Sequence, residues 1–435
     1  MPNQTLRFCG HLSSFWVGIA IGVLGIIPRA LANPTPQSSG NTESNTDPQA
    51  LQAPINPVWQ LEASDASTLV FPKTSTMAEI EVSSDGVPRT ELRGEAVFSL
   101  IQTAGHRPNS GDPLRPSFGN RIRLNFETRF SGEDRLRLRL QTTNVAELDD
   151  VFDTDLARLS IQGDDQNRVS LSRLDYQFPI GDDTNVFIQA IGGSISDIAD
   201  PLNPRLSSSS RGAISRFGQR NPLYRQGGNA GVGLAHDFNE QINLSLGYLG
   251  DDLDLFSDEE SIAFAQLTFD PTDSIRLGLL YTYGLNGLDS GTGSHLANDP
   301  FADQSKAIAA HSVGLQGTAD ITEQLTLSGW AGYTRATATD LPSHPQADIL
   351  NWAFTIGYSG LFRDDDLGGL VIGRPPHVLS RSHQTSPPWH IEVLYQIRMN
   401  DHITITPGIV VITNPEADLN RSTIVVGTLR TLFRF

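Results

Sequence analysis

Polar and apolar residues alternate strictly along much of the chain from residue 91 to residue 435. In residues 121–130 (RIRLNFETRF) each odd-numbered position is polar, and each even-numbered position is apolar or threonine. In residues 134–141 (DRLRLRLQ) arginines alternate with leucines. A period of two residues predicts β-strands that turn one face toward water and the other toward an apolar phase.

Sixteen segments share this pattern and are predicted as strands. Their spans are 91–103, 118–130, 134–144, 166–178, 184–192, 228–238, 241–250, 260–270, 273–284, 307–319, 322–335, 347–360, 366–374, 387–400, 402–413 and 421–435. Most of them reach the roughly 9–11 residues that a tilted strand needs to cross a bilayer.

The connections between these segments differ in length in a regular way. Those after even-numbered strands are mostly short (131–133, 181–183, 239–240, 271–272 and 401), and those after odd-numbered strands are mostly long (104–117, 145–165, 193–227, 285–306 and 375–386). In lipid a sheet must close, because every backbone polar group needs a partner, and sixteen strands leave an aqueous lumen. The sequence therefore predicts an all-β fold, a sixteen-stranded antiparallel transmembrane β-barrel with short periplasmic turns and long extracellular loops.

The first 90 residues follow a different pattern. Arg7 precedes an apolar run at 15–27, and Ala30-Leu31-Ala32 follows it, which is typical of a signal peptide cleaved after residue 32. Residues 33–90 are rich in Pro, Ser, Thr and Asn and are predicted to be a low-complexity periplasmic tail. We therefore expect export through the inner membrane and a barrel, residues 91–435, in the cell outer membrane.

Composition excludes several classes of function. The chain has 31 Lys+Arg, 49 Asp+Glu and one Cys, with a formal net charge of −18. This balance is opposite to the basic footprint of a nucleic-acid-binding protein. One cysteine excludes a disulfide scaffold and a cysteine-ligated metal site. Nucleotide-binding, hydrolase and zinc-protease motifs are absent from the sequence, so we predict that the protein is not an enzyme and has no catalytic residues, cofactor or bound metal.

Arginine supplies 29 of the 31 basic residues, and many of these arginines share the polar faces of neighbouring strands. The residues predicted to line a pore are Arg121, Arg123, Arg129, Arg135, Arg137, Arg139 and Glu127. Such a wall would orient hydroxylated or anionic solutes. Alternatively, the arginines pair with Glu95, Glu127, Asp175 or Glu392 and shape the wall, and the two interpretations are compatible.

Two kinds of long connection carry candidate function. Residues 193–227 are expected to fold into the lumen as a constriction loop through Arg211, Arg216, Arg220 and Arg225, the alternative being an extracellular cap. Two acidic connections are expected to form a cation-attracting rim, which includes Asp149, Asp150, Asp153, Asp251, Asp252 and Asp254. Their spacing does not match a calcium loop. Aromatic residues near strand ends predict interfacial girdles, among them Phe130, Phe178, Tyr248, Phe269, Tyr283, Trp330, Tyr333 and Trp389.

Several segments resemble one family of membrane proteins. RIRLNFETRFSGEDRLRLRLQTTN, ISRFGQRNPLYR, GVGLAHDFNEQINLSLGYL and the final ITITPGIVVITNPEADLNRSTIVVGTLRTLFRF are similar to cyanobacterial outer-membrane porins of the OprB-type carbohydrate-selective family, some of which are described as iron-uptake porins. The resemblance covers about residues 91–435. Members usually carry a surface-layer-homology domain and a coiled coil before the barrel, whereas residues 33–90 contain no heptads, which leaves peptidoglycan binding open.

The resemblance implies a porin for passive diffusion of small hydrophilic solutes, which are carbohydrates, inorganic ions including iron, or both. The alternating C-terminal strand with Phe433 and Phe435 resembles the signal that the barrel assembly machinery reads in bacterial outer-membrane proteins. Outer-membrane lipid is the expected surrounding, and porins of sixteen strands are often homotrimers. The alternative function is a plugged structural or adhesion barrel of the cell envelope.

Overall fold

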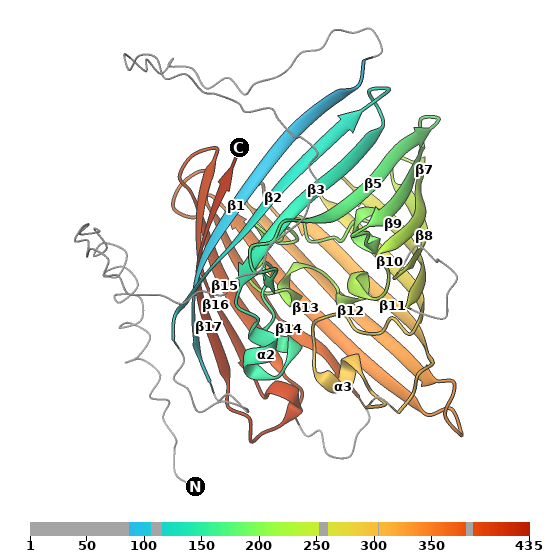
Figure 1. Ribbon diagram of the computed structural model, residues 1–435, viewed down its shortest axis with the longest axis vertical. Helices are drawn as coiled ribbons and strands as arrows, with labels where there is room; N and C mark the ends of the chain where they lie inside the picture. Colours follow the sequence, from blue (N-terminus) through green and yellow to red (C-terminus); the bar gives the residue numbers. More distant parts are fainter. Residues whose placement is uncertain (1–86, 106–114, 252–259, 303, 380–385) are drawn as a thin grey trace, which may run out of the picture. The chain divides into compact units, whose positions relative to one another are not determined.

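Sixteen long strands form one closed antiparallel sheet in the computed structural model (Figure 1). The structure describes residues 87–105, 115–251, 260–302, 304–379 and 386–435. The predicted signal peptide, the predicted tail up to residue 86, and the rim residues Asp252 and Asp254 lie outside the described residues. The division of the chain into signal, tail and barrel therefore stays a prediction.

The strands follow the chain around the barrel. They are β1 (Arg89–Ala104), β2 (Ser117–Arg129), β3 (Arg135–Val145), β4 (Gly163–Asp164), β5 (Ser170–Ile180), β6 (Thr184–Ile191), β7 (Ala230–Asn239), β8 (Ile242–Gly250), β9 (Ser261–Thr272), β10 (Ile275–Leu285), β11 (Ile308–Asp320), β12 (Leu325–Ala338), β13 (Gln346–Ser359), β14 (Leu367–Val378), β15 (Trp389–Arg398), β16 (Ile403–Thr413) and β17 (Ile424–Arg434). β4 is a two-residue strand that pairs with the end of β3. β1 pairs with β2 on one edge and with β17 on the other, so the sheet closes on itself.

The prediction of a sixteen-stranded antiparallel barrel is confirmed, and the errors lie at strand ends. The strand predicted at 166–178 begins at Ser170, because Gln166 and Asn167 take up positive φ angles in a turn. The turn predicted at 271–272 is also wrong. β9 continues through Thr272, and the turn to β10 follows it.

The two faces of the sheet carry different side chains, as the alternation predicts. Ile122 is 37% exposed and Leu277 is 47% exposed on the outer face, where lipid would cover them. Arg121, the neighbour of Ile122 in the chain, is 3% exposed on the inner face. Short turns gather at one end of the barrel, where β1 begins and β17 ends, and long connections gather at the other end.

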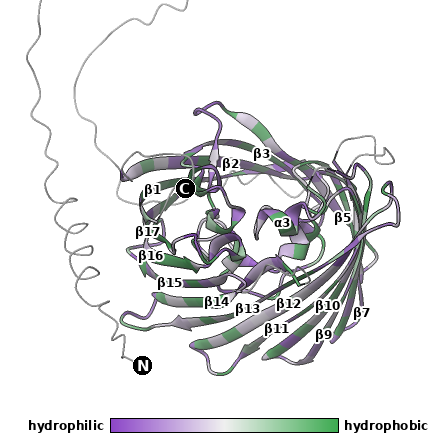
Figure 2. Cartoon of the chain, turned by 90° about the horizontal axis from the view of Figure 1, so that it is seen from below, coloured by the Kyte–Doolittle hydropathy of each residue, from purple (hydrophilic) through white to green (hydrophobic). Residues whose placement is uncertain are grey.

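The long connections contain the short helices. These are α2 (Leu148–Phe152), η1 (Asp155–Ala157), η2 (Ile195–Asp197), η3 (Phe217–Gln219), η4 (Pro222–Arg225), α3 (His295–Asn298) and η5 (Pro415–Ala417). Viewed along the barrel, segments of these connections lie inside the ring of strands (Figure 2). Within the described residues, no helix is long and apolar enough to span a membrane.

Aromatic side chains on the outer face gather near both ends of the strands. At the short-turn end, the rings of Phe130 and Phe178 both contact Tyr176. At the long-loop end, Trp352 meets Trp389 edge to face. Trp330 does not belong to such a band. It is 6% exposed on the inner face, because it occupies an inward position of β12 opposite Ala353.

Candidate pore constriction

The connection between β6 and β7, residues 192–229, lies inside the barrel and is called the inner loop below. Short turns fix its path. The Ser194 hydroxyl donates to the Asp197 carboxylate over 2.6 Å at the start of η2. At η4 the Asn221 side chain accepts from the amide of Leu223, and Pro222 occupies the first helical position, where its missing N–H costs nothing.

Apolar side chains of the inner loop pack against the barrel wall. Phe217 lies edge to face against Trp330 of β12, with ring centroids 5.8 Å apart, and against His390 of β15 at 5.1 Å. The Tyr224 hydroxyl donates to Gln266 of β9. Because these groups leave water when the loop folds inward, their burial stabilises the inward position. The inner loop therefore lies inside the barrel, and its role as a constriction stays a prediction.

Two buried charged residues of the wall hold the backbone of the inner loop. Arg430 on β17 donates to the carbonyl of Gly212 over 2.6 Å. Glu392 on β15 accepts from the amides of Ile214 and Ser215. Both charged side chains are buried, at 2% and 0% exposure. Only β16 separates the strands of Arg430 and Glu392. The two side chains therefore hold neighbouring carbonyl and amide groups of the inner loop.

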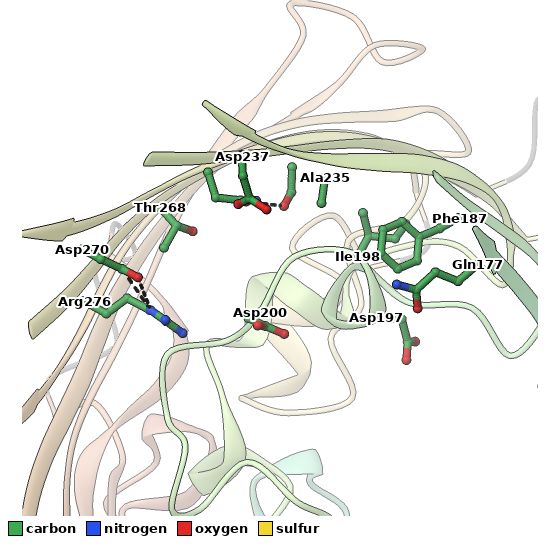
Figure 3. Close-up of a pocket in the computed structure, with 12 residues that line it drawn as sticks. Gln177, Phe187, Asp197, Ile198, Asp200, Ala235, Asp237, Thr268, Asp270 and Arg276 are labelled. Carbon is green, nitrogen blue, oxygen red and sulfur yellow. Dashed lines mark hydrogen bonds and ion pairs between the residues drawn. The ribbon is translucent and has the colours of Figure 1, made fainter. Parts of the chain in front are cut away.

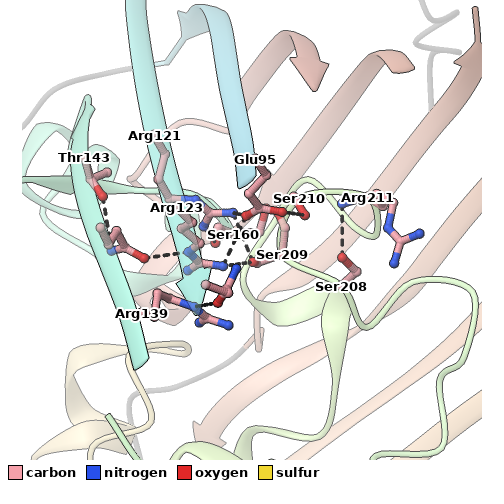
Figure 4. A network of polar contacts seen from close by, with 12 residues as sticks. Glu95, Arg121, Arg123, Arg139, Thr143, Ser160, Ser208, Ser209, Ser210 and Arg211 are labelled. Atoms are coloured by element: carbon pink, nitrogen blue, oxygen red, sulfur yellow. Dashed lines mark hydrogen bonds and ion pairs between the residues drawn. The ribbon is translucent and has the colours of Figure 1, made fainter. Parts of the chain in front are cut away.

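A second network joins β1 and β2 to the inner loop (Figure 4). The Ser209 hydroxyl accepts from Arg121 at 3.1 Å and from Arg123 at 3.0 Å. The Ser210 hydroxyl donates to Glu95 over 2.9 Å, and Glu95 lies 3.4 Å from Arg121. Two of the predicted wall arginines therefore face the loop rather than open water.

A third network links β3 and β5 to the start of the inner loop. Arg137 donates to Asp175 over 2.9 Å and lies 3.4 Å from Asp197. Arg173 also pairs with Asp197 and donates to the carbonyl of Gly192 over 2.8 Å. Burial opposes ionisation of Asp197, but Arg173 and Arg137 beside it hold the pKa of its carboxyl below the usual value.

The other predicted wall residues are Arg129, Arg135, Arg139 and Glu127. Arg139 donates to Asn125 over 2.6 Å, and Arg135 donates to a glutamine of β5 over 3.1 Å. Arg129 is exposed at the turn to β3, and Glu127 is half-buried on the inner face. Of the predicted carboxylate partners, Glu95 and Asp175 pair with wall arginines. Glu392 instead binds the inner loop, and no ion pair is found for Glu127 among the described residues.

The four arginines of the inner loop differ in environment. Arg211 is exposed, whereas Arg220 and Arg225 donate to groups of the loop itself. Burial lowers the pKa of Arg216 to about 10, and Arg158 of the neighbouring connection adds to this effect. Arg220 and Arg225 therefore brace the fold of the loop, and Arg211 is available to water.

An acidic cavity of about 390 Å³ lies between the inner loop and strands β5 to β10 (Figure 3). Asp197 and Asp200 line it from the loop, and Asp237 and Asp270 line it from the wall. Arg276 binds Asp270 through Nε, at 2.9 and 3.0 Å from the two carboxylate oxygens. The sequence pattern alone does not single out these aspartates. Period-two alternation places the two wall residues on an inner face, but it does not position those of the loop.

The acidic rim is partly used for contacts within a connection and between connections. Asp149 pairs with Arg158, and Asp153 pairs with Arg421 at 3.0 Å. Asp150 and Asp251 are exposed. The described residues contain no group of three or more His, Cys, Asp or Glu side chains placed to hold a metal ion.

The C-terminal residues close the barrel seam. Gly94 and Phe435 exchange backbone hydrogen bonds of 2.7 and 3.0 Å, and Phe435 is 65% exposed on the outer face. Phe433 contacts Phe98 of β1 edge to face.

Comparisons with known proteins agree with this architecture. Residues 74–435 match the family described as carbohydrate-selective porin, OprB family. An uncharacterized protein of Synechocystis sp. is 33% identical over 383 residues, which are 80% of this chain and 69% of that protein. An uncharacterized protein of Nostoc sp. is 28% identical over 393 residues, 82% of this chain and 67% of that protein.

Solved structures with the same fold are porins. OprB of Pseudomonas putida has a TM-score of 0.54 and 12% identity, and the match covers 80% of this chain and 94% of that one. An anion-selective porin from Comamonas acidovorans has a TM-score of 0.52 and 11% identity, and the match covers 80% of this chain and 100% of that one.

Proposed function

The chain belongs to the OprB family of carbohydrate-selective porins, and from this we propose that its barrel is a water-filled channel for passive diffusion of small hydrophilic solutes across the outer membrane. Family and fold point to a channel rather than an enzyme. The observation that carries the proposal is the inner loop. It is held against charged residues of β1–β3, β15 and β17, while a polar cavity of about 390 Å³ lies toward β5–β10.

We assign the role of constriction to the inner loop, and that of pore lining to the aspartates of the cavity and to the predicted wall residues that do not bind the loop. Carboxylates, amides and guanidiniums together offer both acceptors and donors, which suits the hydroxyl groups of a sugar. Small inorganic ions, iron included, belong to the same proposal, and the fixed charges of the lumen would sort them by sign. Reversal potentials in salt gradients would measure that sorting.

The cellular setting is also part of the proposal. An N-terminal signal would direct export, and the strand ending at Phe433 and Phe435 would be read by the barrel assembly machinery. The outward apolar side chains support embedding in outer-membrane lipid. Family likeness supports a homotrimer as the assembled state.

A plugged structural barrel is the second candidate, and one observation favours it. The inner loop contacts strands around most of the lumen. Asn203 accepts from Thr355 of β13 at 3.1 Å, Tyr224 bonds Gln316 of β11, and Arg430 binds from β17. A plug of this kind would block solutes and leave the barrel to act in adhesion or envelope structure.

Planar bilayers separate the two candidates. Purified refolded protein is expected to give stepwise currents of nanosiemens scale, and a bilayer that stays silent with correctly folded protein would contradict the channel. Liposomes loaded with sugars of graded size then measure the exclusion limit. Swelling with small sugars and not with large ones is the expected result.

A further inference from the structure

Two arginines face outward near the long-loop end of the barrel. Arg335 lies on β12 and Arg374 on β14, with β13 between them. Arg374 pairs in register with Trp352, whose neighbour Ala353 is buried on the inner face. Trp389 opens β15 on the same outer face, since the next residue, His390, is fully buried inside.

The two arginines differ in their partners. Arg335 Nε lies 2.9 Å from the Asp348 carboxylate, so its charge is balanced within the protein. For Arg374, no ion pair and no side-chain hydrogen bond is found among the described residues, and its Nε is buried without a partner. Its guanidinium carbon lies 4.6 Å from the ring centroid of Trp389, and Trp389 contacts Trp352 with centroids 5.6 Å apart.

The guanidinium of Arg374 is therefore a cation without a counter-charge among the described residues, on the outer face that lipid would cover. Tryptophan prefers the headgroup region of a bilayer, which places the Trp352–Trp389 pair at that level. A charge near the hydrocarbon is costly unless a counter-charge meets it. Stacking on Trp389 fixes the plane of the guanidinium, and a fixed fork of N–H donors matches the oxygens of a phosphate.

We propose that Trp352, Arg374 and Trp389 form a binding site for the phosphate of an anionic lipid headgroup. The two indole rings cover the apolar part of the lipid next to its headgroup, and the guanidinium donates to the phosphate oxygens. The site rests on the proposed embedding of the barrel in the outer membrane. It is separate from the lumen, so lipid binding and solute passage are measured independently.

Quenching of tryptophan fluorescence tests the site. The full-length barrel is reconstituted into phosphatidylcholine vesicles containing increasing fractions of brominated phosphatidylglycerol, because bromine quenches only indoles in contact with the lipid. The preference for phosphatidylglycerol over phosphatidylcholine is expected to fall about fivefold in Arg374→Met, the value of one interfacial basic residue. Arg335→Met is the matched control and is expected to keep the wild-type preference.

Two results would overturn the site. One is an equal preference in the wild type, Arg374→Met and Arg335→Met. The other is release of quenching by inorganic phosphate added to the solution, which would mean a site for a free anion. Folding of each variant is checked by the heat-dependent shift of the barrel in gel electrophoresis. Bilayer currents of Arg374→Met are expected to equal those of the wild type, so a silent channel and a missing lipid site are distinguished.

Discussion

The two sides of the lumen use charged residues in opposite ways. Toward β1–β3, β15 and β17, Arg121, Arg430 and Glu392 are buried and bind the inner loop. Toward β7–β10, Asp237 is exposed to the cavity, and Asp200 is exposed on the facing part of the loop. Arginine-rich strands therefore act mainly as a scaffold, while the acidic side meets water.

This difference shows that a charge on a pore wall is not the same as a charge offered to a solute. A buried guanidinium whose donors are satisfied by carbonyls cannot also bind a passing molecule without losing those bonds. The Asp237 carboxylate accepts a hydrogen bond from the Asn243 amide at 2.8 Å and is nevertheless exposed to water. The number of arginines on an inner face is consequently a poor measure of channel selectivity.

The largest effect is expected from substituting Arg430, which binds the inner loop from the barrel wall. Arg430→Met leaves buried carbonyls of the inner loop unpaired and removes a buried positive charge from this part of the wall. We expect the free energy of unfolding to fall by about 3–5 kcal/mol and the single-channel conductance to rise as the loop loosens. Urea unfolding of the reconstituted barrel measures the first quantity, and bilayer recording measures the second.

The control for this change is another inner-face arginine that does not bind the loop. Arg129 is exposed and donates to carbonyls of its own turn. Arg129→Met is expected to change the free energy of unfolding by no more than about 0.5 kcal/mol. If both variants lost the same stability, the special role of Arg430 would be refuted.

The pH dependence of the free energy of unfolding is expected to distinguish two aspartates of the inner loop, Asp197 and Asp200. Arg173 and Arg137 hold the pKa of Asp197 below 3.8, so its ionised form stabilises the fold at neutral pH. That contribution is lost as the pH falls below 3.8 and through the pKa of the folded state. Asp197→Asn is expected to cost about 1.5–3 kcal/mol at neutral pH, and the cost should shrink in acid.

Asp200→Asn is the matched control, because Asp200 is exposed and lies on the cavity side. Its expected cost is within about 0.5 kcal/mol at neutral pH. Unfolding free energies at neutral and acidic pH measure both variants. A pH-independent cost for Asp197→Asn would mean that its ion pairs do not supply the stability.

The exposed rim gives the smallest expected effect. Neutralising Asp150 and Asp251 together, as Asp150→Asn and Asp251→Asn, should lower cation entry by less than about twofold at low salt, and the effect should disappear at high salt through screening. Conductance measured over a series of salt concentrations tests this. A change that persists at high salt would require a specific site at the rim.

The barrel could be predicted from the sequence because its main determinant is local. Alternation with a period of two decides which side chains face lipid, and the order of short and long connections decides which end they occupy. Strand ends were less predictable, as Ser170 shows, since turn geometry at 166–169 ends the pairing. Trp330 departs from the predicted girdle, because aromatic character alone does not distinguish an inward position from one at the membrane interface.

The position of the inner loop is only partly predictable from the sequence. Phe217, Leu223 and Tyr224 indicate a loop that packs against something, and they do pack inside the barrel. The partners of the loop depend on how it crosses the lumen, which no local pattern encodes. The alternation in its strand predicts that Arg430 points inward. It does not predict the partners of Arg430, which are backbone carbonyls of residues more than 200 positions away.

Cysteine accessibility tests the central contrast between the two sides of the lumen most directly. The one native cysteine, Cys9, lies in the predicted signal peptide. Single-channel current is recorded from Asp237→Cys and Ser210→Cys while a charged thiol reagent is added. We predict that modification reduces the current through Asp237→Cys and leaves the current through Ser210→Cys unchanged. The reason is that Ser210, on the inner loop, is only 6% exposed and its hydroxyl donates to Glu95 of the wall. A reduced current in Ser210→Cys with none in Asp237→Cys would contradict the account.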